Sequence, residues 1–295
     1  MGLAPCAVAS DLYPLQMNDQ TRWYTVHLPG PLDNTKKYPL VLVLHGAVSN
    51  AKLMEKVSGM NEVADKHGFI AVYPNGSSRF SKGWASWNGG DCCGWAVKHK
   101  VDDIGFLDRL ISTLEMQYPV DPRRVYIAGF SNGAMLEYKA AAKLQDKVAA
   151  LGVVEGSMKG DEAKPTVPMP VIIFHGTEDT RVPINGGGGR YAKYGNPVNK
   201  KPLSYAVKFW CEVNGCSGEP KGTMTTNAPT DPTNPEIIRN EYDNAEGKPM
   251  VVVYKLLGGD HGWPGGEKSR AWGAKPALNL NASEEMWKFF SQFAR

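Results

Sequence analysis

Short apolar segments alternate with segments of helical periodicity along most of this chain. The run Leu-Val-Leu-Val-Leu at 40–44 is continuous, which is typical of a strand buried on both faces of a sheet. Residues 51–67 place apolar side chains near a helical period, which predicts a helix. Further strands are predicted at 69–73, 124–130, 149–154, 171–174 and 250–257, and further helices at 102–118, 132–144 and 282–293. This alternation predicts an α/β fold with a doubly wound, mostly parallel sheet flanked by helices.

Glycine and proline make up 53 of the 295 residues, about 18% against roughly 12% in average usage. This content argues against a coiled coil or helical solenoid, whereas 42% hydrophobic and 21% charged residues exclude disorder. No stretch has the composition of a linker, so we expect a single domain over residues 1–295. Segments 185–201 and 219–235, rich in Gly, Asn, Thr or Pro, are expected to be surface excursions. The early segment 22–28 alternates polar and apolar residues and predicts an antiparallel strand.

Charge and hydropathy narrow the classes of partner. The 33 basic and 30 acidic residues are mixed along the sequence, without the basic clusters that bind a phosphate backbone. No run of apolar residues is long enough to cross a membrane. The given chain also begins without a basic segment and long apolar core, so no signal peptide is predicted in it. We therefore expect neither a nucleic acid nor a membrane as partner.

The five cysteines leave their pairing open. Cys211 and Cys216 are candidates for a disulfide, because Asn-Gly at 214–215 lets the chain turn back between them. Cys92 and Cys93 are adjacent, and we expect two small unbonded side chains there in preference to a bridge.

No metal or cofactor is predicted from the residue pattern. Cysteines and histidines lack the paired spacing of a zinc site. Asp102 and Asp103 stand at the start of a predicted helix, where a cap and a charge that complements the helix dipole are the expected roles.

A Gly-x-Ser-x-Gly pentapeptide lies at 129–133, between a predicted buried strand and an Ala-rich helix. In that setting the glycines allow a sharp turn that exposes the serine at a helix N-terminus. Ser131 is therefore the candidate nucleophile. The alternative is that Ser131 only caps the helix.

A serine nucleophile needs a histidine base and a carboxylate that orients it, and in this topology the acid precedes the histidine. Downstream of the serine the chain has only His175 and His261. Asp179 lies in the loop after a buried strand and His261 in a glycine-rich loop after the next one, so we predict this pair. His175 is expected to be structural, and Glu178 and Asp260 are the rival carboxylates.

An oxyanion formed at the serine requires backbone N–H donors. We predict that Asn132, which follows the serine, and Ala47, in the loop after the strand at 40–44, provide them. Because both act through the backbone, the side-chain identity at these positions says little about this role.

Five ordered motifs resemble those of a known family. They lie at 87–94, 101–107, 129–135, 176–183 and 258–265. Together they are similar to the polyhydroxybutyrate depolymerase and feruloyl esterase group of the α/β-hydrolases, the first carbohydrate esterase family. The resemblance runs from about residue 27 to the C-terminus. It implies a single α/β-hydrolase catalytic domain whose triad is Ser131, Asp179 and His261.

The resemblance also implies a substrate surface and a location. Trp263 resembles a family tryptophan that lines the acyl or polymer-binding face, and Trp87 is a second candidate, with core packing as its favoured alternative. Relatives often pair the cysteine equivalent to Cys216 with one where this chain has Asp243-Asn244. A secreted or periplasmic protein is implied, with further domains of a larger secreted enzyme as possible partners.

The most specific prediction is a serine esterase that releases ferulic acid from plant cell-wall polysaccharide without a cofactor. Its substrate would be an ester on plant polysaccharide or a small aromatic ester. Acetylxylan esterase and polyhydroxybutyrate or polyester depolymerase are the close alternatives. A carbohydrate-binding protein that performs no chemistry on a hydrolase scaffold is the distant one.

Overall fold

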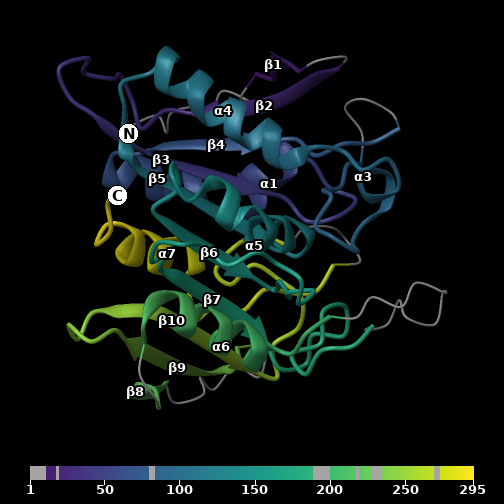
Figure 1. Ribbon diagram of the computed structural model, residues 1–295, viewed down its shortest axis with the longest axis vertical. Helices are drawn as coiled ribbons and strands as arrows, with labels where there is room; N and C mark the ends of the chain where they lie inside the picture. The colour runs from purple at the N-terminus through teal and green to yellow at the C-terminus, as the bar shows by residue number, and fades with distance from the viewer. Residues whose placement is uncertain are drawn as a thin grey trace, which may run out of the picture.

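Ten strands form one mixed sheet in the described part of the chain, in the order β1-β2-β4-β3-β5-β6-β7-β10-β9-β8. The computed structural model in Figure 1 describes residues 11–17, 20–79, 84–188, 200–216, 219–226, 234–268 and 273–295. The strands are β1 (Tyr13–Gln16), β2 (Thr21–His27), β3 (Tyr38–Leu44), β4 (Ile70–Pro74), β5 (Val120–Phe130), β6 (Ala150–Val154), β7 (Val171–Gly176), β8 (Lys221–Thr226), β9 (Glu236–Asp243) and β10 (Pro249–Leu257).

The centre of this sheet is parallel and its edges are antiparallel. Strands β4, β3, β5, β6, β7 and β10 pair in parallel, and Leu42 of β3 lies opposite Val72 on one side and Ile127 on the other. Strands β1 and β2 continue the sheet antiparallel at one edge, as β9 and β8 do at the other. The fold is therefore the α/β-hydrolase type that the sequence predicts, with β2 as the predicted antiparallel strand.

Helices cover both faces of the sheet (Figure 1). They are α1 (Ala51–Ser58), α2 (Met60–His67), α3 (Gly94–Lys98), α4 (Asp103–Gln117), α5 (Asn132–Leu144), α6 (Leu203–Asn214) and α7 (Ala282–Phe290). Helices α4, α5 and α6 share one apolar core with Leu40 and Leu42 of β3. Helices α1, α2 and α7 share a second core with Val41 and Val43. Alternate residues of one continuous apolar run thus fill two different cores, as expected of a strand buried on both faces.

Local chemistry explains where several helices begin and end. The predicted helix at 51–67 is two helices, because Gly59 between them has a left-handed φ of +60°. Asp102 caps α4 as predicted, since its Oδ1 accepts the backbone N–H of Gly105 at 2.9 Å. The strands β1 and β9 were not predicted. Strand β8 lies within the predicted excursion 219–235, which is therefore wrong for residues 221–226. Most of the other excursion, residues 189–199, lies outside the described residues.

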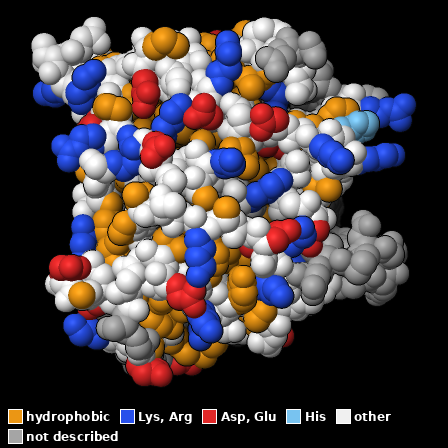
Figure 2. Space-filling view, in the orientation of Figure 1, with side chains coloured by type: hydrophobic (Ala, Val, Ile, Leu, Met, Phe, Trp, Pro, Cys, Tyr) orange, Lys and Arg blue, Asp and Glu red, His pale blue; other side chains and the backbone are white. Residues whose placement is uncertain are grey.

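Basic and acidic side chains are interspersed across the middle of the face shown in Figure 2. Among the helices of the described ranges, none is long and apolar enough to cross a bilayer. The site residues predicted from the sequence follow the carboxyl ends of β3, β5, β7 and β10, which meet at one edge of the parallel sheet.

Candidate active site

Ser131 occupies a sharp turn between β5 and α5. Its backbone has φ +54° and ψ −113°, and its side chain makes no capping hydrogen bond to α5, which argues against the helix-cap alternative. A Cβ atom at Gly129 would lie 2.6 Å from the backbone nitrogen of Ala134, and one at Gly133 would lie 2.6 Å from the carbonyl oxygen of Leu44. Both glycines are therefore required for the close packing that exposes the serine.

The structure brings Asp179 and His261 together. Nδ1 of His261 lies 2.6 Å from Oδ2 of Asp179, and Oδ1 accepts the backbone N–H groups of Arg181 and Val182 at 2.7 and 2.8 Å. Burial alone would raise the pKa of Asp179, but the hydrogen bond and charge of His261 outweigh it and hold that pKa well below its usual range. Asp179 is thus an ionised carboxylate that fixes the imidazole through Nδ1.

The rival groups have other roles. Glu178 is exposed, and Oδ1 of Asp260 accepts the backbone N–H of His261 at 2.7 Å. His175 is buried and its Nε2 lies 2.8 Å from the carbonyl oxygen of Val182, so Nε2 must donate. Burial lowers the pKa of His175. His175 is therefore a neutral structural histidine, as predicted.

Ser131 and His261 line the same cavity, which has a volume of about 300 Å³. The His261 ring packs against Phe130, with the ring centroids 5.0 Å apart. Because Nδ1 is engaged by the carboxylate, Nε2 is the ring nitrogen left for the cavity. Ala47, the predicted second oxyanion donor, also lines this cavity. Its other walls are Gly46, Val48, Ser49, Leu53, Met54, Val57, Cys92, Cys93, Met135, Arg181, Val182 and Lys200.

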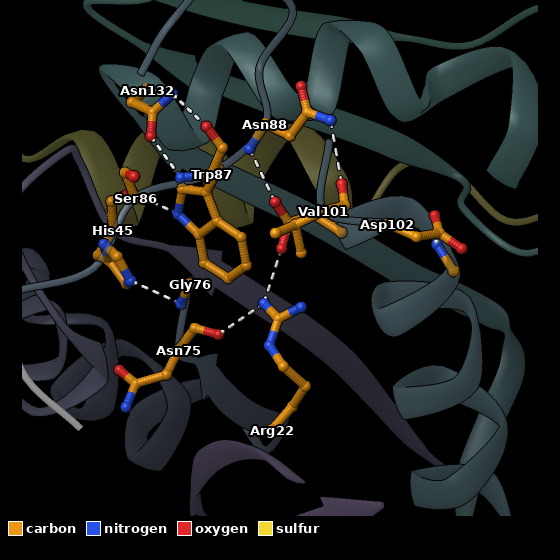
Figure 3. Close-up of polar contacts among 12 residues, drawn as sticks. Arg22, His45, Asn75, Gly76, Ser86, Trp87, Asn88, Val101, Asp102 and Asn132 are labelled. Carbon is orange, nitrogen blue, oxygen red and sulfur yellow. Dashed lines mark hydrogen bonds and ion pairs between the residues drawn. The ribbon is translucent and has the colours of Figure 1, made fainter. Parts of the chain in front are cut away.

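The loop that carries Ala47 is held by a buried polar network (Figure 3). The His45 ring donates through Nδ1 to the Gly46 carbonyl at 2.6 Å and accepts the Gly76 N–H at Nε2 at 2.9 Å. Nε1 of Trp87 donates to the His45 carbonyl at 2.8 Å. Burial lowers the pKa of His45 to about 4, which agrees with the neutral ring that these two bonds require. A Cβ added at Gly46 would lie 3.3 Å from Cβ of Ser131, so the loop passes directly beside the serine.

The Asn132 side chain joins the serine turn to this network (Figure 3). Its Oδ1 accepts the Trp87 N–H at 2.7 Å, and its Nδ2 donates to the carbonyl oxygens of Trp87 at 3.1 Å and Cys92 at 2.7 Å. The sequence predicts only a backbone role for Asn132, so this role of its side chain was not predicted. The sequence motif places only the backbone N–H of this residue, whereas the fold gives its amide group three hydrogen bonds.

A buried ion pair contacts this network through Asn75 and Asn88. Nη2 of Arg22 in β2 lies 2.7 Å from Oδ1 of Asp103 and donates to the Asn75 carbonyl at 3.0 Å. Oδ2 of Asp103 accepts the Asn88 N–H at 2.7 Å. The guanidinium also lies 4.0 Å from the ring centroid of Phe106. Asp103 thus joins β2 to the loop that contains Asn88. The sequence predicts only that its charge complements the dipole of the helix.

Residues 23–185 match the family described as Esterase PHB depolymerase, which is more than half of the chain. The chain belongs to this family. It is 30% identical to feruloyl esterase B of Piromyces equi over 241 residues, which is 80% of this chain and 42% of that protein. It is 24% identical over 240 residues to poly(3-hydroxyalkanoate) depolymerase C of Paucimonas lemoignei, covering 77% of this chain and 55% of that protein. The chain thus spans about half the length of these two relatives.

A solved structure gives the same fold. Acetyl xylan esterase from Aspergillus awamori matches with a TM-score of 0.59 and 18% identity, covering 85% of this chain and 94% of that one. The chain therefore has the α/β-hydrolase fold.

The two tryptophans that were candidates for a substrate contact lie inside the protein. Trp87 is 0% exposed and its indole holds the loop that carries Ala47, so its core-packing alternative is the correct one. Trp263 is 1% exposed, its Nε1 donates to the Ser283 hydroxyl at 3.0 Å, and it does not line the described cavity at Ser131. The prediction of a substrate contact by Trp263 is therefore wrong, because its distance from His261 along the chain does not fix which way its ring points.

The cysteines also differ from expectation. Cys92 and Cys93 form a disulfide, so the prediction of two unbonded side chains is wrong. Cys211 and Cys216 are free thiols, and the candidate disulfide between them is not formed. The Cys216 thiol lies 3.4 Å from the Tyr242 carbonyl oxygen. Burial and the neighbouring Cys216 raise the pKa of Cys211 to about 12, so this thiol is protonated at neutral pH.

Glu155 is a buried residue at this site that was not predicted from the sequence. Among the described residues, one polar atom each from Glu155, Asp179 and His261 lie within 4.8 Å of one another. Nδ1 of His261 and Oδ2 of Asp179 already bind each other, so the group does not present free metal ligands. The sequence did contain a signal for Glu155, because an acidic residue directly follows a buried strand there. Functional residues of a parallel sheet gather at the carboxyl ends of its strands.

Proposed function

We propose that this protein is a carboxylic ester hydrolase that works through Ser131, His261 and Asp179 and forms an acyl-enzyme. The observation that carries the proposal is the hydrogen bond of 2.6 Å that fixes His261 on Asp179, at the cavity that Ser131 also lines. His261 Nε2 removes the hydroxyl proton of Ser131 as its oxygen attacks the ester carbonyl. Nε2 then returns the proton to the leaving alcohol. Water activated by the same nitrogen hydrolyses the acyl-enzyme and releases the acid.

Backbone N–H groups of Ala47 and Asn132 would stabilise the tetrahedral oxyanion. Hydrogen bonds of the His45 ring, the Trp87 indole and the Asn132 amide support this role, because they hold the backbone near Ala47 and Asn132 in place. Donors held in place before the reaction do not have to reorganise as the negative charge develops, which is the largest contribution of many such sites.

The acyl group that fits best is a feruloyl or related cinnamoyl group. The cavity of about 300 Å³ is lined largely by apolar side chains, including Leu53, Met54 and Val57 from α1. A planar aromatic acid would fill such a space, whereas an acetyl group would leave most of it empty. The similarity to a feruloyl esterase of Piromyces equi supports the same choice.

The alcohol side of the ester would be a sugar of plant polysaccharide. A second cavity of about 560 Å³ shares Ala47, Val48 and Cys93 with the first and therefore adjoins it. Trp84, which is 70% exposed, and Trp95 also line this second cavity. Exposed indole rings offer flat faces for the apolar side of a pyranose. A polysaccharide substrate is consistent with a protein that acts outside the cell, in association with further domains.

The triad is tested by Ser131→Ala with p-nitrophenyl acetate. Turnover should disappear while the thermal unfolding midpoint stays near that of the wild type, because the removed hydroxyl caps nothing. A fluorophosphonate probe should label the wild type and not the variant. Retained turnover in Ser131→Ala would overturn the assignment, and an unlabelled, inactive wild type would favour a binding protein without chemistry.

The substrate is tested by comparing kcat/KM for methyl ferulate, acetylated xylan and polyhydroxybutyrate. The volume of the acyl cavity predicts the highest value for methyl ferulate. A preference for acetylated xylan would mean that a loop narrows the cavity, and activity only on the polyester would identify a depolymerase.

A further inference from the structure

Glu155 follows β6 directly, and its side chain is buried against the Asp179–His261 pair. Glu155 is 1% exposed, and its carboxyl belongs to the group of polar atoms that lie within 4.8 Å of one another. Its backbone has φ +50°, a left-handed conformation that residues other than glycine disfavour. Backbone strain of this kind is concentrated at functional sites, so the Glu155 side chain is a candidate functional group.

The Glu155 and Asp179 carboxyl groups lie close together, with one oxygen atom of each in the group whose members are within 4.8 Å of one another. Two ionised carboxylates this close together and buried would repel each other strongly, so one member of the pair carries a proton. Asp179 accepts two backbone N–H groups and Nδ1–H of His261, which together stabilise its negative charge. Glu155 accepts one backbone N–H, that of Gly176, at 3.0 and 3.2 Å from its two oxygens. The proton therefore belongs on Glu155.

The charged and titratable groups that face Glu155 agree with this assignment. Asp179 and Asp260 carry the same sign as an ionised Glu155 would, and burial is the largest cause that raises its pKa well above the usual range. Nε2 of His175 lies 3.5 Å from Oε2 of Glu155, but this ring is neutral and donates to the Val182 carbonyl. His261 is engaged by Asp179.

We propose that Glu155 is a positioning residue of this site, which donates its carboxylic acid proton to the Asp179 carboxylate. The bond holds Asp179 against His261 and places no second negative charge beside the base. It also draws part of the Asp179 charge away from the imidazole. This inference rests on the proposed function, in which His261 is the general base.

The variant Glu155→Gln tests the proton directly. A glutamine is neutral, can accept the Gly176 N–H through its oxygen and can donate to Asp179 through its nitrogen. We expect kcat/KM within about threefold of the wild type and an unchanged midpoint on the acid side of the pH profile. An ionised glutamate would behave differently, because its removal would take away a charge within 4.8 Å of the pair. The midpoint would then fall by roughly two pH units, and that result would overturn the proposal.

Glu155→Met removes the donor but keeps an unbranched side chain. We expect kcat for a small ester to fall about tenfold with little change in KM, and the acid-side midpoint to rise as Asp179 regains its full charge. A purely structural role would lower the unfolding temperature without moving that midpoint. The matched control is Glu178→Gln, which removes a carboxylate that is exposed and screened by solvent. Its midpoint should equal that of the wild type.

Infrared spectroscopy tests the same proton without catalysis and remains informative if Glu155→Met fails to fold. The wild type minus Glu155→Gln difference spectrum at neutral pH should contain the carbonyl stretch of a protonated carboxylic acid. Absence of that band would refute a neutral Glu155. Retained turnover in Ser131→Ala would instead refute the proposed function and leave the band in place, so the two failures are distinguishable.

Discussion

Truncation of Asn132 to alanine should damage both stability and catalysis. This side chain joins the serine turn to Trp87 and Cys92, and the Trp87 indole in turn holds the loop of the proposed oxyanion donor Ala47. The Trp87 N–H would lose its partner and remain buried, which costs about 1 to 3 kcal/mol. The carbonyl groups of Trp87 and Cys92 keep their bonds to the backbone N–H groups of Cys93 and Gly89. Losing their second bonds costs about 1 kcal/mol each.

The sum is about 4 kcal/mol of unfolding free energy. A chain of 295 residues has an unfolding entropy of about 0.6 kcal/mol/K, so the midpoint of thermal unfolding should fall by roughly 6 °C. The Asn132 and Ala47 donors would also lose their alignment. We expect kcat for p-nitrophenyl acetate to fall roughly tenfold to a hundredfold, with KM little changed.

Calorimetry and initial-rate kinetics on the same preparations measure both effects. Asn279→Ala is the control, because its exposed amide makes one hydrogen bond, to the Pro235 carbonyl, far from Ser131 along the chain. Its unfolding free energy should change by less than about 0.5 kcal/mol. An Asn132→Ala variant with a midpoint within about 1 °C of the wild type and an unchanged kcat would refute the reasoning.

Two further predictions concern pH and the alcohol-side cavity. Burial lowers the pKa of His45 to about 4, from about 6.5 in the unfolded chain. Unfolding therefore takes up a proton below pH 6.5. As a result, the free energy of unfolding should fall by about 2 kcal/mol between pH 7 and pH 5. Thermal unfolding of His45→Gln should therefore depend less on pH over that range than the wild type, and an equal dependence would contradict a neutral buried His45. Trp84→Ala should raise KM for feruloylated arabinoxylan several-fold while leaving methyl ferulate unaffected, as kinetics on both substrates would show. Equal changes for the two substrates would argue against a sugar contact by Trp84.

The sequence predicts those features that depend on local pattern. The continuous apolar run of β3 indicates a strand buried on both faces, and the loops after β7 and β10 are where a parallel sheet gathers its functional groups. Asp179 and His261 could be paired for that reason. The left-handed turn at Gly59 was not predicted, because a period of 3.6 residues continues across it when only apolar spacing is considered.

Other features depend on which way a side chain points in three dimensions. Trp263 and Trp87 are buried although the sequence places them near the site, and Trp84 is exposed although nothing in its neighbourhood distinguishes it. The protonated Glu155 follows from its distance to Asp179, which is 24 residues away along the chain. A sequence pattern gives the type of each group, but the hydrogen bonds that decide its charge come from the fold.

The two cores on opposite faces of the sheet separate substrate preference from catalytic support. Met54 and Val57 of α1 belong to the core shared with α2 and α7, and they line the cavity at Ser131 that is proposed to hold the acyl group. Trp87, which anchors the loop that carries Ala47, belongs to the core shared with α4 and α5. Substitutions in α1 can therefore reshape the acyl cavity while the anchor behind the nucleophile keeps its packing. A single scaffold of this kind is well suited to diversification toward esters of different acyl size, because changes of specificity need not pass through inactive intermediates.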